Sequence, residues 1–182
     1  MALSSTIYSF EVGLNDADRG VYEQLSFRVA QHPSESCEYL VTRVLAYCLE
    51  YTQGLSFSKG LSEPDVPALT VHDLTGTLRS WIEIGSPEAS RLHKAAKASP
   101  RVAVYCHKDV EAFLGRLAAE SIHRADQIEI YAVDRELIAA FAARITRRMK
   151  FDLAVTERHL YLSIGEETLS GAVSAHRLEI RG

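Results

Sequence analysis

The spacing of apolar and polar residues changes several times along the chain and predicts an alternation of strands and helices. Period-two patterns at 5–12 and 20–31, on either side of the turn-forming NDADRG, predict an opening β-hairpin. A period of three to four residues begins after Ser34 and stops before Gly54. This change of period predicts a helix over about 34–52.

The middle of the chain continues to alternate between strand and helix patterns. Two apolar stretches, ALTVHD and LRSWIEI, predict an antiparallel hairpin over about 66–84 with Leu74-Thr75-Gly76 as its loop, because glycine in the third loop position suits this turn. The other elements expected are a strand at 55–60, a helix that starts at Ser86-Pro87-Glu88 and runs to about Ala98, a strand at 101–107, a helix at 109–120, a strand at 127–133, a helix at 135–148 and three strands in the remaining C-terminal segment.

The order of these elements predicts the fold class. Strand, helix and strand alternate from 78 to 133, which is typical of parallel crossover connections. We therefore expect an α/β fold of the mixed α+β kind, with a mixed β-sheet flanked by helices and an additional β element formed by the N- and C-terminal strands. No repeat and no Pro/Gly/Ser-rich linker divides the chain, so 1–182 is expected to be a single domain.

Composition narrows the class of protein further. A chain of 182 residues with 47% apolar residues is long enough to bury a proper core, and its net charge of −4 excludes a surface that attracts nucleic acid everywhere. Cys37, Cys48 and Cys106 are odd in number and far apart, so buried free thiols in a reducing cytoplasm are expected rather than disulfides or zinc. Neither a secretory leader nor a membrane-spanning run is expected.

Two carboxylates stand out at the open end of the predicted hairpin. If Asp73 faces Thr77, positions that sum to 150 are paired, and Asp65 lies across from Gly85. Glu83 then points to the same side of the sheet as Asp65, with the two β-carbons about 7 Å apart. Two carboxylates at that separation are able to hold one divalent cation between them.

The two neighbouring helices add further charged residues. Arg91 and Lys94 are three residues apart and so share one helical face, and Glu35 and Glu38 have the same spacing at the start of the first long helix. Each of these residues also has a simpler explanation. Exposed lysines and arginines are usually solvated, and glutamates at a helix start are stabilised by the helix dipole.

Several segments together resemble the YaeQ family over nearly the whole chain. These segments are HPSE at 32–35, Arg43, GLSEPD at 60–65, WIEIGSPE at 81–88 and RLHKA at 91–95. The order of Pro-Asp, a strand with Glu and a basic helix also resembles the wider PD-(D/E)XK nuclease-like superfamily. This resemblance implies a restriction-endonuclease-like core at about 34–133 with extra β structure.

The resemblance also implies roles for single residues. Asp65 matches the Asp of the PD motif and Glu83 the acidic residue of (D/E)XK, so both are expected to hold Mg²⁺ with help from Glu38 or Glu35. The motif lysine would fall at position 85, where this chain has Gly85. Lys94 is then the expected replacement, with Arg91 second. The implied reaction is Mg²⁺-dependent hydrolysis of a phosphodiester in nucleic acid.

A different class of function stays open: an inactive nuclease-like fold that acts as a binding or regulatory module. Gly85 in place of lysine and the negative net charge favour it. Such a module is expected to contact phosphates through a basic run, three members of which share one face of the predicted helix: Arg144, Arg147, Arg148 and Lys150. Cations near a helix C-terminus are also explained by its dipole. A lysine that reaches the Asp65–Glu83 pair would favour the enzyme.

Other classes of site find little support in the sequence. No glycine-rich nucleotide loop is present, and neither a nucleotide cofactor nor zinc is expected. His72, His107 and His159 flank predicted strands and are expected at the surface or at sheet edges. His32 either orders the entrance to the first helix or supports the site, and Trp81 either walls the pocket beside Glu83 or packs under the helix that follows.

Overall fold

The computed structural model describes residues 4–58 and 65–179, and over these residues ten strands join in one mixed sheet. The strands are β1 (Thr6–Asp16), β2 (Val21–Gln31), β3 (Leu55–Phe57), β4 (Leu69–His72), β5 (Leu78–Ile84), β6 (Arg101–Cys106), β7 (Glu129–Val133), β8 (Arg148–Thr156), β9 (His159–Ile164) and β10 (Glu167–His176). The α-helices are α1 (Cys37–Leu49), α2 (Ala89–Ala98), α3 (Val110–Leu117) and α4 (Arg135–Ala142), and Ala125–Gln127 is a short 3-10 helix, η2.

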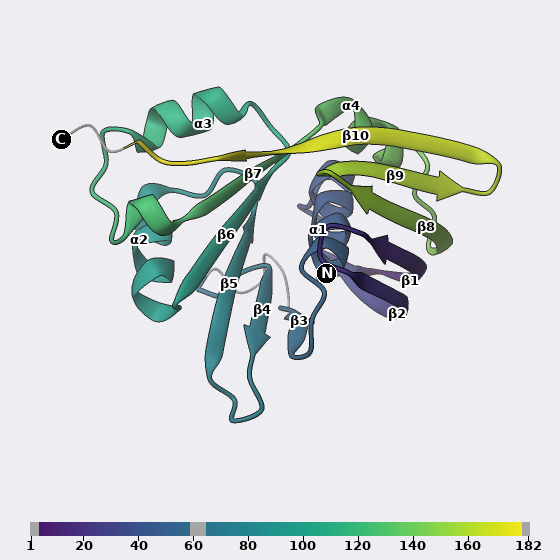
Figure 1. Cartoon of the computed structure of the whole chain (residues 1–182), viewed down its shortest axis with the longest axis horizontal. Coiled ribbons are helices and arrows are strands. Elements are labelled where there is room, and N and C mark those ends of the chain that lie inside the picture. Colours follow the sequence, from purple (N-terminus) through teal and green to yellow (C-terminus); the bar gives the residue numbers. More distant parts are fainter. Residues whose placement is uncertain (1–3, 59–64, 180–182) are drawn as a thin grey trace.

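The sheet runs in the order β2-β1-β8-β9-β10-β7-β6-β5-β4-β3 and bends at β10. The first part of β10 pairs with β9 and its last part, Val173–His176, pairs with β7, so one strand belongs to both halves. Figure 1 shows β10 in yellow crossing both halves, with α1 between them. A β-carbon at Gly171 would lie 2.8 Å from the β-carbons of Asp134 and Leu137, so this position lets α4 approach the strand closely.

The mixed sheet with flanking helices is the fold class that the sequence pattern predicts. β5, β6 and β7 are parallel to one another, while β4 and β5 are antiparallel, as expected for the crossovers and the central hairpin. β1 pairs with β2 in the opening hairpin and with β8 from the C-terminal region, which forms the additional β element.

The apolar core consists of two clusters, of which the larger joins the two halves of the sheet. The larger cluster surrounds α1 and α4 and joins them to the inner faces of both halves of the sheet. The second lies between α2 and α3 and the opposite face of β5–β7. α1 is buried on nearly every side, from Leu40 to Ala46, which explains why apolar residues occupy more than one face of this helix.

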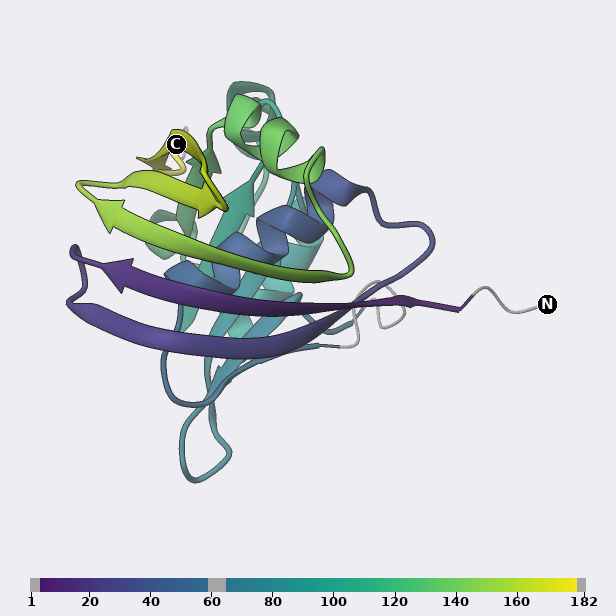
Figure 2. The same ribbon diagram turned by 90° about the vertical axis from the view of Figure 1, so that its right-hand side faces the viewer.

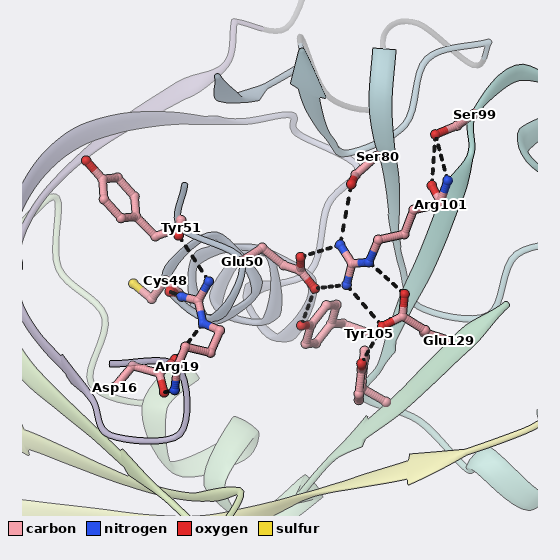
Figure 3. Close-up of polar contacts among 11 residues, drawn as sticks. Asp16, Arg19, Cys48, Glu50, Tyr51, Ser80, Ser99, Arg101, Tyr105 and Glu129 are labelled. Atoms are coloured by element: carbon pink, nitrogen blue, oxygen red, sulfur yellow. Dashed lines mark hydrogen bonds and ion pairs between the residues drawn. The ribbon is translucent and has the colours of Figure 1, made fainter. Parts of the chain in front are cut away.

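The C-terminal end of α1 is held by an arginine from each half (Figure 3). Arg19 follows β1 and forms an ion pair with Asp16, the last residue of that strand. It donates hydrogen bonds to the carbonyl oxygens of Cys48 and Tyr51. Cys48 lies in the last turn of α1 and Tyr51 directly after the C-cap residue Glu50, so Arg19 fixes the end of the helix.

Arg101 of β6 makes the second attachment (Figure 3). It donates Nη1–H to Oε2 of Glu50, the residue that ends α1, at 2.7 Å, and Nε–H to Glu129 of β7 at 2.6 Å. The Tyr105 hydroxyl donates to Oε1 of Glu50 at 2.6 Å. The side chains of Arg19 and Arg101 line a cavity of about 480 Å³ together with Arg158.

Several predicted boundaries are wrong at helix ends. The helix predicted at 34–52 is shorter, because Ser36 rather than Ser34 accepts the N-terminal capping bond, from the backbone N–H of Tyr39. The helix expected to start at Ser86 begins three residues later at Ala89. The helix predicted at 135–148 ends at Ala142, and the following residues turn into β8. β10 ends at His176, so residues 177–179, which belong to the predicted strand pattern HRLEI, do not extend the sheet.

The cysteines form no disulfide, and Cys48 and Cys106 are buried as expected, but Cys37 is exposed at the start of α1. In the part of the chain that the structure describes, no helix is long and apolar enough to cross a membrane.

The attachment of α1 through Arg101 predicts a large loss of stability in Arg101→Met. The substitution leaves the carboxylates of Glu50 and Glu129 without their cation. We therefore expect the free energy of unfolding to fall by about 3 kcal/mol. This value is at the low end for buried ion pairs, because part of the Arg101 side chain is exposed to water. Urea unfolding measures this change. Arg79→Met, which removes an exposed ion pair with Asp73, is the control and should have little effect.

The same variant tests a pH dependence. Burial acts to raise the pKa of Glu129, but hydrogen bonds from Arg101 and Tyr131 outweigh it and hold the pKa below the ordinary value of 4.5. The ionised form is therefore favoured by folding, and this contribution is present above the ordinary pKa and is lost as the pH falls. The difference in stability between the unmodified protein and Arg101→Met should narrow below about pH 4.5; a constant difference would contradict this account.

Candidate functional site at the carboxyl end of β5

Glu83 lies near the carboxyl end of β5 and is buried, with 4% of its surface exposed. Its Oε1 atom accepts two hydrogen bonds, from Trp81 Nε1–H at 2.6 Å and from Arg91 Nε–H at 2.7 Å. Trp81 is two residues earlier on the same strand, so the alternation of side chains puts both on one face. Trp81 therefore packs in the core and also contacts the site residue, which combines the two predicted roles.

Burial raises the pKa of the Glu83 carboxyl above its ordinary value, although the hydrogen bond from Trp81 and the charge of Arg91 act in the opposite direction. The net direction means that desolvation of the carboxylate is the largest contribution.

α2 brings two cations to this end of the strand. Arg91 joins Glu83 to the loop before β4, because its Nη2–H donates to the Val66 carbonyl oxygen at 2.9 Å. One turn further along α2, Lys94 Nζ lies 2.7 Å from Oδ1 of Asp65. Asp65 is exposed, with 85% of its side chain accessible, and the Lys94 hydrogen bond lowers the pKa of this carboxyl. α2 thus makes two ion pairs at this end of β5, a buried one between Arg91 and Glu83 and an exposed one between Lys94 and Asp65.

The route by which Asp65 arrives differs from the predicted one. Asp73 and Thr77 do face each other around the loop, but a β-bulge follows between Val71 and His72. Leu69 therefore pairs with Ile82, one residue out of the predicted register. The extension of the ladder to Asp65 is wrong as well, since β4 begins only at Leu69. Asp65 approaches the site from a turn instead. Pro64 of the Pro-Asp pair lies outside the described residues.

Gly85 explains why no lysine follows Glu83 at the motif position. Its φ of +92° is in the left-handed region, and its N–H donates to the Tyr105 carbonyl oxygen as the chain leaves β5. A β-carbon here has space, since only the His107 ring lies nearby at 3.8 Å, but the backbone conformation disfavours any side chain. The cation of the site is supplied by α2 instead.

Two residues next to this site were not found by sequence reasoning. His107 follows β6 and is 7% exposed, so the prediction that it lies at the surface is wrong. Burial, and then the charge of Lys108, lowers its pKa to about 4, so its imidazole is neutral near pH 7. Its ring meets that of Tyr39 edge-on at 6.3 Å between centroids. The positions of these residues in the sequence could have predicted this. Gly85 and His107 directly follow two adjacent parallel strands, and the carboxyl ends of such strands lie side by side.

Tyr39 connects the site to a buried ion pair below it. Burial raises the Tyr39 pKa to about 12, and Arg43, Glu35 and Glu83 all act on it through their charges. Arg43 is only 1% exposed and pairs with Glu35 at 2.9 Å. Glu35 precedes α1 and is buried in this ion pair, so the prediction that it shares a helical face with Glu38 is wrong.

The remaining predicted site residues are Glu38 and His32. Glu38 is exposed on the first turn of α1, and its charge acts on His107. Ser34 donates its backbone N–H to His32 Nδ1, which ties His32 to the segment before α1. Within residues 4–58 and 65–179, no three His, Cys, Asp or Glu side chains gather closely enough to hold a metal ion, so Glu38 does not complete a cluster with the pair.

The predicted basic helical face does not exist, because α4 ends before it. Arg144 lies after α4 and forms a two-pronged ion pair with Glu167, at 2.6 Å for the shorter contact. Arg147 follows in the connection, and Arg148 is the first residue of β8. The three arginines therefore do not form one helical face.

The fold and the site define a class of protein: a mixed α+β protein whose parallel strands end beside a buried glutamate and two helical cations. Comparison with known proteins gives the family. The family model described as YaeQ protein matches residues 1–173, and the chain belongs to this family.

Relatives and solved structures agree with that assignment. The chain is 31% identical to the YaeQ protein from Pseudomonas syringae, whose crystal structure superimposes with a TM-score of 0.86 over 94% of this chain and 95% of that one. The crystal structure of YaeQ from Xanthomonas axonopodis pv. citri gives 29% identity and a TM-score of 0.84, covering 97% of this chain and 100% of that one. Uncharacterized protein YaeQ of Escherichia coli strain K12 is 27% identical over 177 residues, covering 96% of this chain and 97% of its own.

The conformation of Gly85 predicts a cost for restoring the motif lysine. Gly85→Lys should lower the free energy of unfolding by about 1–2 kcal/mol, because a side chain disfavours the left-handed backbone. Gly115→Ala is the control, since Gly115 lies in α3 with open space around it and alanine favours a helix. Urea unfolding compares the two, and equal effects would show that the φ of Gly85 is not limiting.

The hydrogen bond from Trp81 makes Glu83 observable by fluorescence. Trp81 is the one tryptophan of the sequence, so its emission should change as the Glu83 carboxyl titrates above pH 4.5, and Glu83→Gln should abolish that change. Because folding raises this pKa, the folded state binds the proton more strongly than the unfolded state. Stability should therefore fall as the pH rises between the two pKa values, and this fall should be absent in Glu83→Gln.

Proposed function

We propose that the chain is a divalent-metal-dependent phosphodiesterase that acts on nucleic acid, of the PD-(D/E)XK nuclease-like kind. The observation that carries this proposal is the meeting of Lys94 with Asp65 beside the Glu83–Arg91 pair. A carboxylate pair with two adjacent cations matches what phosphodiester hydrolysis needs, namely metal ligands and groups that bind a phosphate.

The donor set is compatible with Mg²⁺. Each carboxylate has one oxygen, Oδ2 of Asp65 and Oε2 of Glu83, to which no described residue donates a hydrogen bond. Mg²⁺ is commonly held by one or two carboxylates while water and substrate phosphate oxygens complete its octahedron, so a third protein ligand is not required. When bound, the ion would polarise the phosphate and lower the pKa of a coordinated water.

The remaining groups have roles that follow from their contacts. Trp81 and Arg91 fix the orientation of the Glu83 carboxylate through the two bonds to Oε1. Lys94, whose side chain is 55% exposed, is free to exchange Asp65 for a substrate phosphate and to offset the negative charge that develops on it. Arg91 bonds both Glu83 and the Val66 carbonyl, so it holds the residue next to Asp65 against the end of β5.

A second candidate is an inactive module that binds phosphate groups through Arg91 and Lys94. The observation that favours it is the neutralisation of Glu83 by Arg91, which is how an unreactive buried carboxylate is stabilised. We place either function in the cytoplasm, because the three cysteines form no disulfide.

Hydrolysis of labelled single-stranded and duplex oligonucleotides in Mg²⁺ tests the proposal. We expect Asp65→Asn, Glu83→Gln and Lys94→Met each to lower the rate by about 10²-fold or more, since each removes a metal ligand or a charge partner of the phosphate. Lys97→Met is the matched control, because Lys97 is exposed in the last turn of the same helix and should be dispensable. EDTA should abolish the activity.

The second candidate predicts a different outcome of the same experiment. A folded protein that binds oligonucleotides without hydrolysing them in Mg²⁺ or Mn²⁺ would support the binding module. Hydrolysis that persists in both Glu83→Gln and Asp65→Asn would contradict the phosphodiesterase at this site and also the inactive binding module.

A further inference from the structure

The half of the sheet formed by β2, β1, β8 and β9 has one face that no helix covers. Burial alternates strictly along β8, where Met149, Phe151, Leu153 and Val155 point into the core. Figure 2 views the molecule from this side, with β1, β2 and β8 in front of α1 and with α4 above β8. Side chains at the alternate positions therefore face solvent across four adjacent strands.

Three cations gather at one end of this face. The strand registers put Arg28 of β2 and Arg148 of β8 on either side of Ser9 in β1, in a single row across the sheet. Lys150 lies two residues along β8, in the next row beside Glu11. Neighbouring positions in this grid are about 5 Å apart across strands and about 7 Å apart along them.

These cations are available for a ligand. In the segments 4–58 and 65–179, no carboxylate forms an ion pair with Arg28, Arg148 or Lys150, whereas Arg19, Arg43, Arg79, Arg91, Arg101 and Arg144 each have such a partner. The three side chains line a hollow of about 630 Å³ over β1, β2 and β8, whose one carboxylate is Glu11. A local positive surface on a chain with a net charge of −4 indicates a site for an anion.

The other end of the same face carries exposed aromatic rings. Tyr22 pairs with Asn15, Asn15 with Ala154 and Ala154 with Tyr161, so both tyrosines belong to one row across four strands. Tyr22 is 63% exposed and Tyr161 is 44% exposed, so both rings are accessible to a ligand on this face. The His159 ring lies beside that of Tyr161, with 4.9 Å between centroids.

We propose that this face binds single-stranded nucleic acid, with its phosphates at Arg28, Arg148 and Lys150 and its bases stacked on Tyr22 and Tyr161. Cations contribute the binding energy to a polyanion, and aromatic rings on an open sheet accept unstacked bases of any sequence. A duplex offers phosphates but keeps its bases paired, so it meets only half of this surface.

This inference goes beyond hydrolysis at β5, because it assigns the capture of a strand to different residues. It also replaces the predicted basic helix. Arg148 contacts the proposed strand from β8, together with Lys150 and the distant Arg28, while Arg144 is engaged by Glu167. Binding measured in EDTA does not depend on metal or on cleavage, so failure of either proposal is distinguishable from failure of the other.

Fluorescence anisotropy with a labelled 20-nucleotide oligo-dT, in EDTA and at several salt concentrations, tests the proposal. The triple variant R28Q/R148Q/K150Q should bind roughly 10- to 100-fold more weakly, and the slope of log affinity against log salt should decrease by about 2, at about 0.7 for each lost phosphate contact. The matched control K97Q/R116Q/R135Q removes the same number of exposed charges from α2, α3 and α4 and should retain binding.

Two further variants test folding and stacking. R28K/R148K keeps the cations and should retain most of the affinity, which separates loss of charge from loss of fold. Tyr22→Ala and Tyr161→Ala should each weaken binding about tenfold while leaving the salt slope unchanged. Three results would overturn the proposal: no binding of oligo-dT by the unmodified protein at low salt, an equal loss in the control triple variant, or a duplex of the same length bound as tightly.

Discussion

The arrangement of the whole molecule depends on how the C-terminal end of α1 is fixed between the two halves of the sheet. Arg19, from the hairpin of β1 and β2, binds the carbonyl groups at that end, and Arg101, from β6, binds Glu50, which terminates the helix. Because α1 is buried on nearly all sides, its position sets the distance between the halves. β10 then joins the halves by pairing with β9 and with β7.

An arginine pairs with each glutamate that is buried within residues 4–58 and 65–179. Glu35, Glu50 and Glu83 are each at most 8% exposed, and each is paired with an arginine, respectively Arg43, Arg101 and Arg91. A buried carboxylate without such a partner would cost several kcal/mol, so these pairs restrict which segments can lie together. At β5 this restriction has a functional consequence. The pairing of Arg91 with Glu83 and Val66 brings the Asp65 turn to the site, and Lys94 meets it one helical turn later.

The sequence predicted most residues of this site, but the strand register used to place them was wrong. The three-residue spacing of Arg91 and Lys94 correctly placed both on one face of α2, and the alternation of β5 placed Trp81 beside Glu83. The bulge at Val71 and His72 has no signature in residue type, and it shifts the ladder by one residue. The burial of His107 was not predicted either, because the sequence around a polar residue after a strand does not show which segments pack over it.

By itself, the sequence determined the identity and order of the elements, the parallel crossovers and the segments that mark the YaeQ family. The elements and their order depend on local periodicity, capping and turn chemistry, which act over a few residues, whereas the family segments are matched by residue identity. Only the tertiary structure decided that Glu35 is buried against Arg43, that α4 stops at Ala142, and that Arg28 lies in one row with Arg148. Such outcomes depend on strand register and on the pairing of buried charges between distant segments. Those energies exist only once the chain has folded, so no local pattern records them.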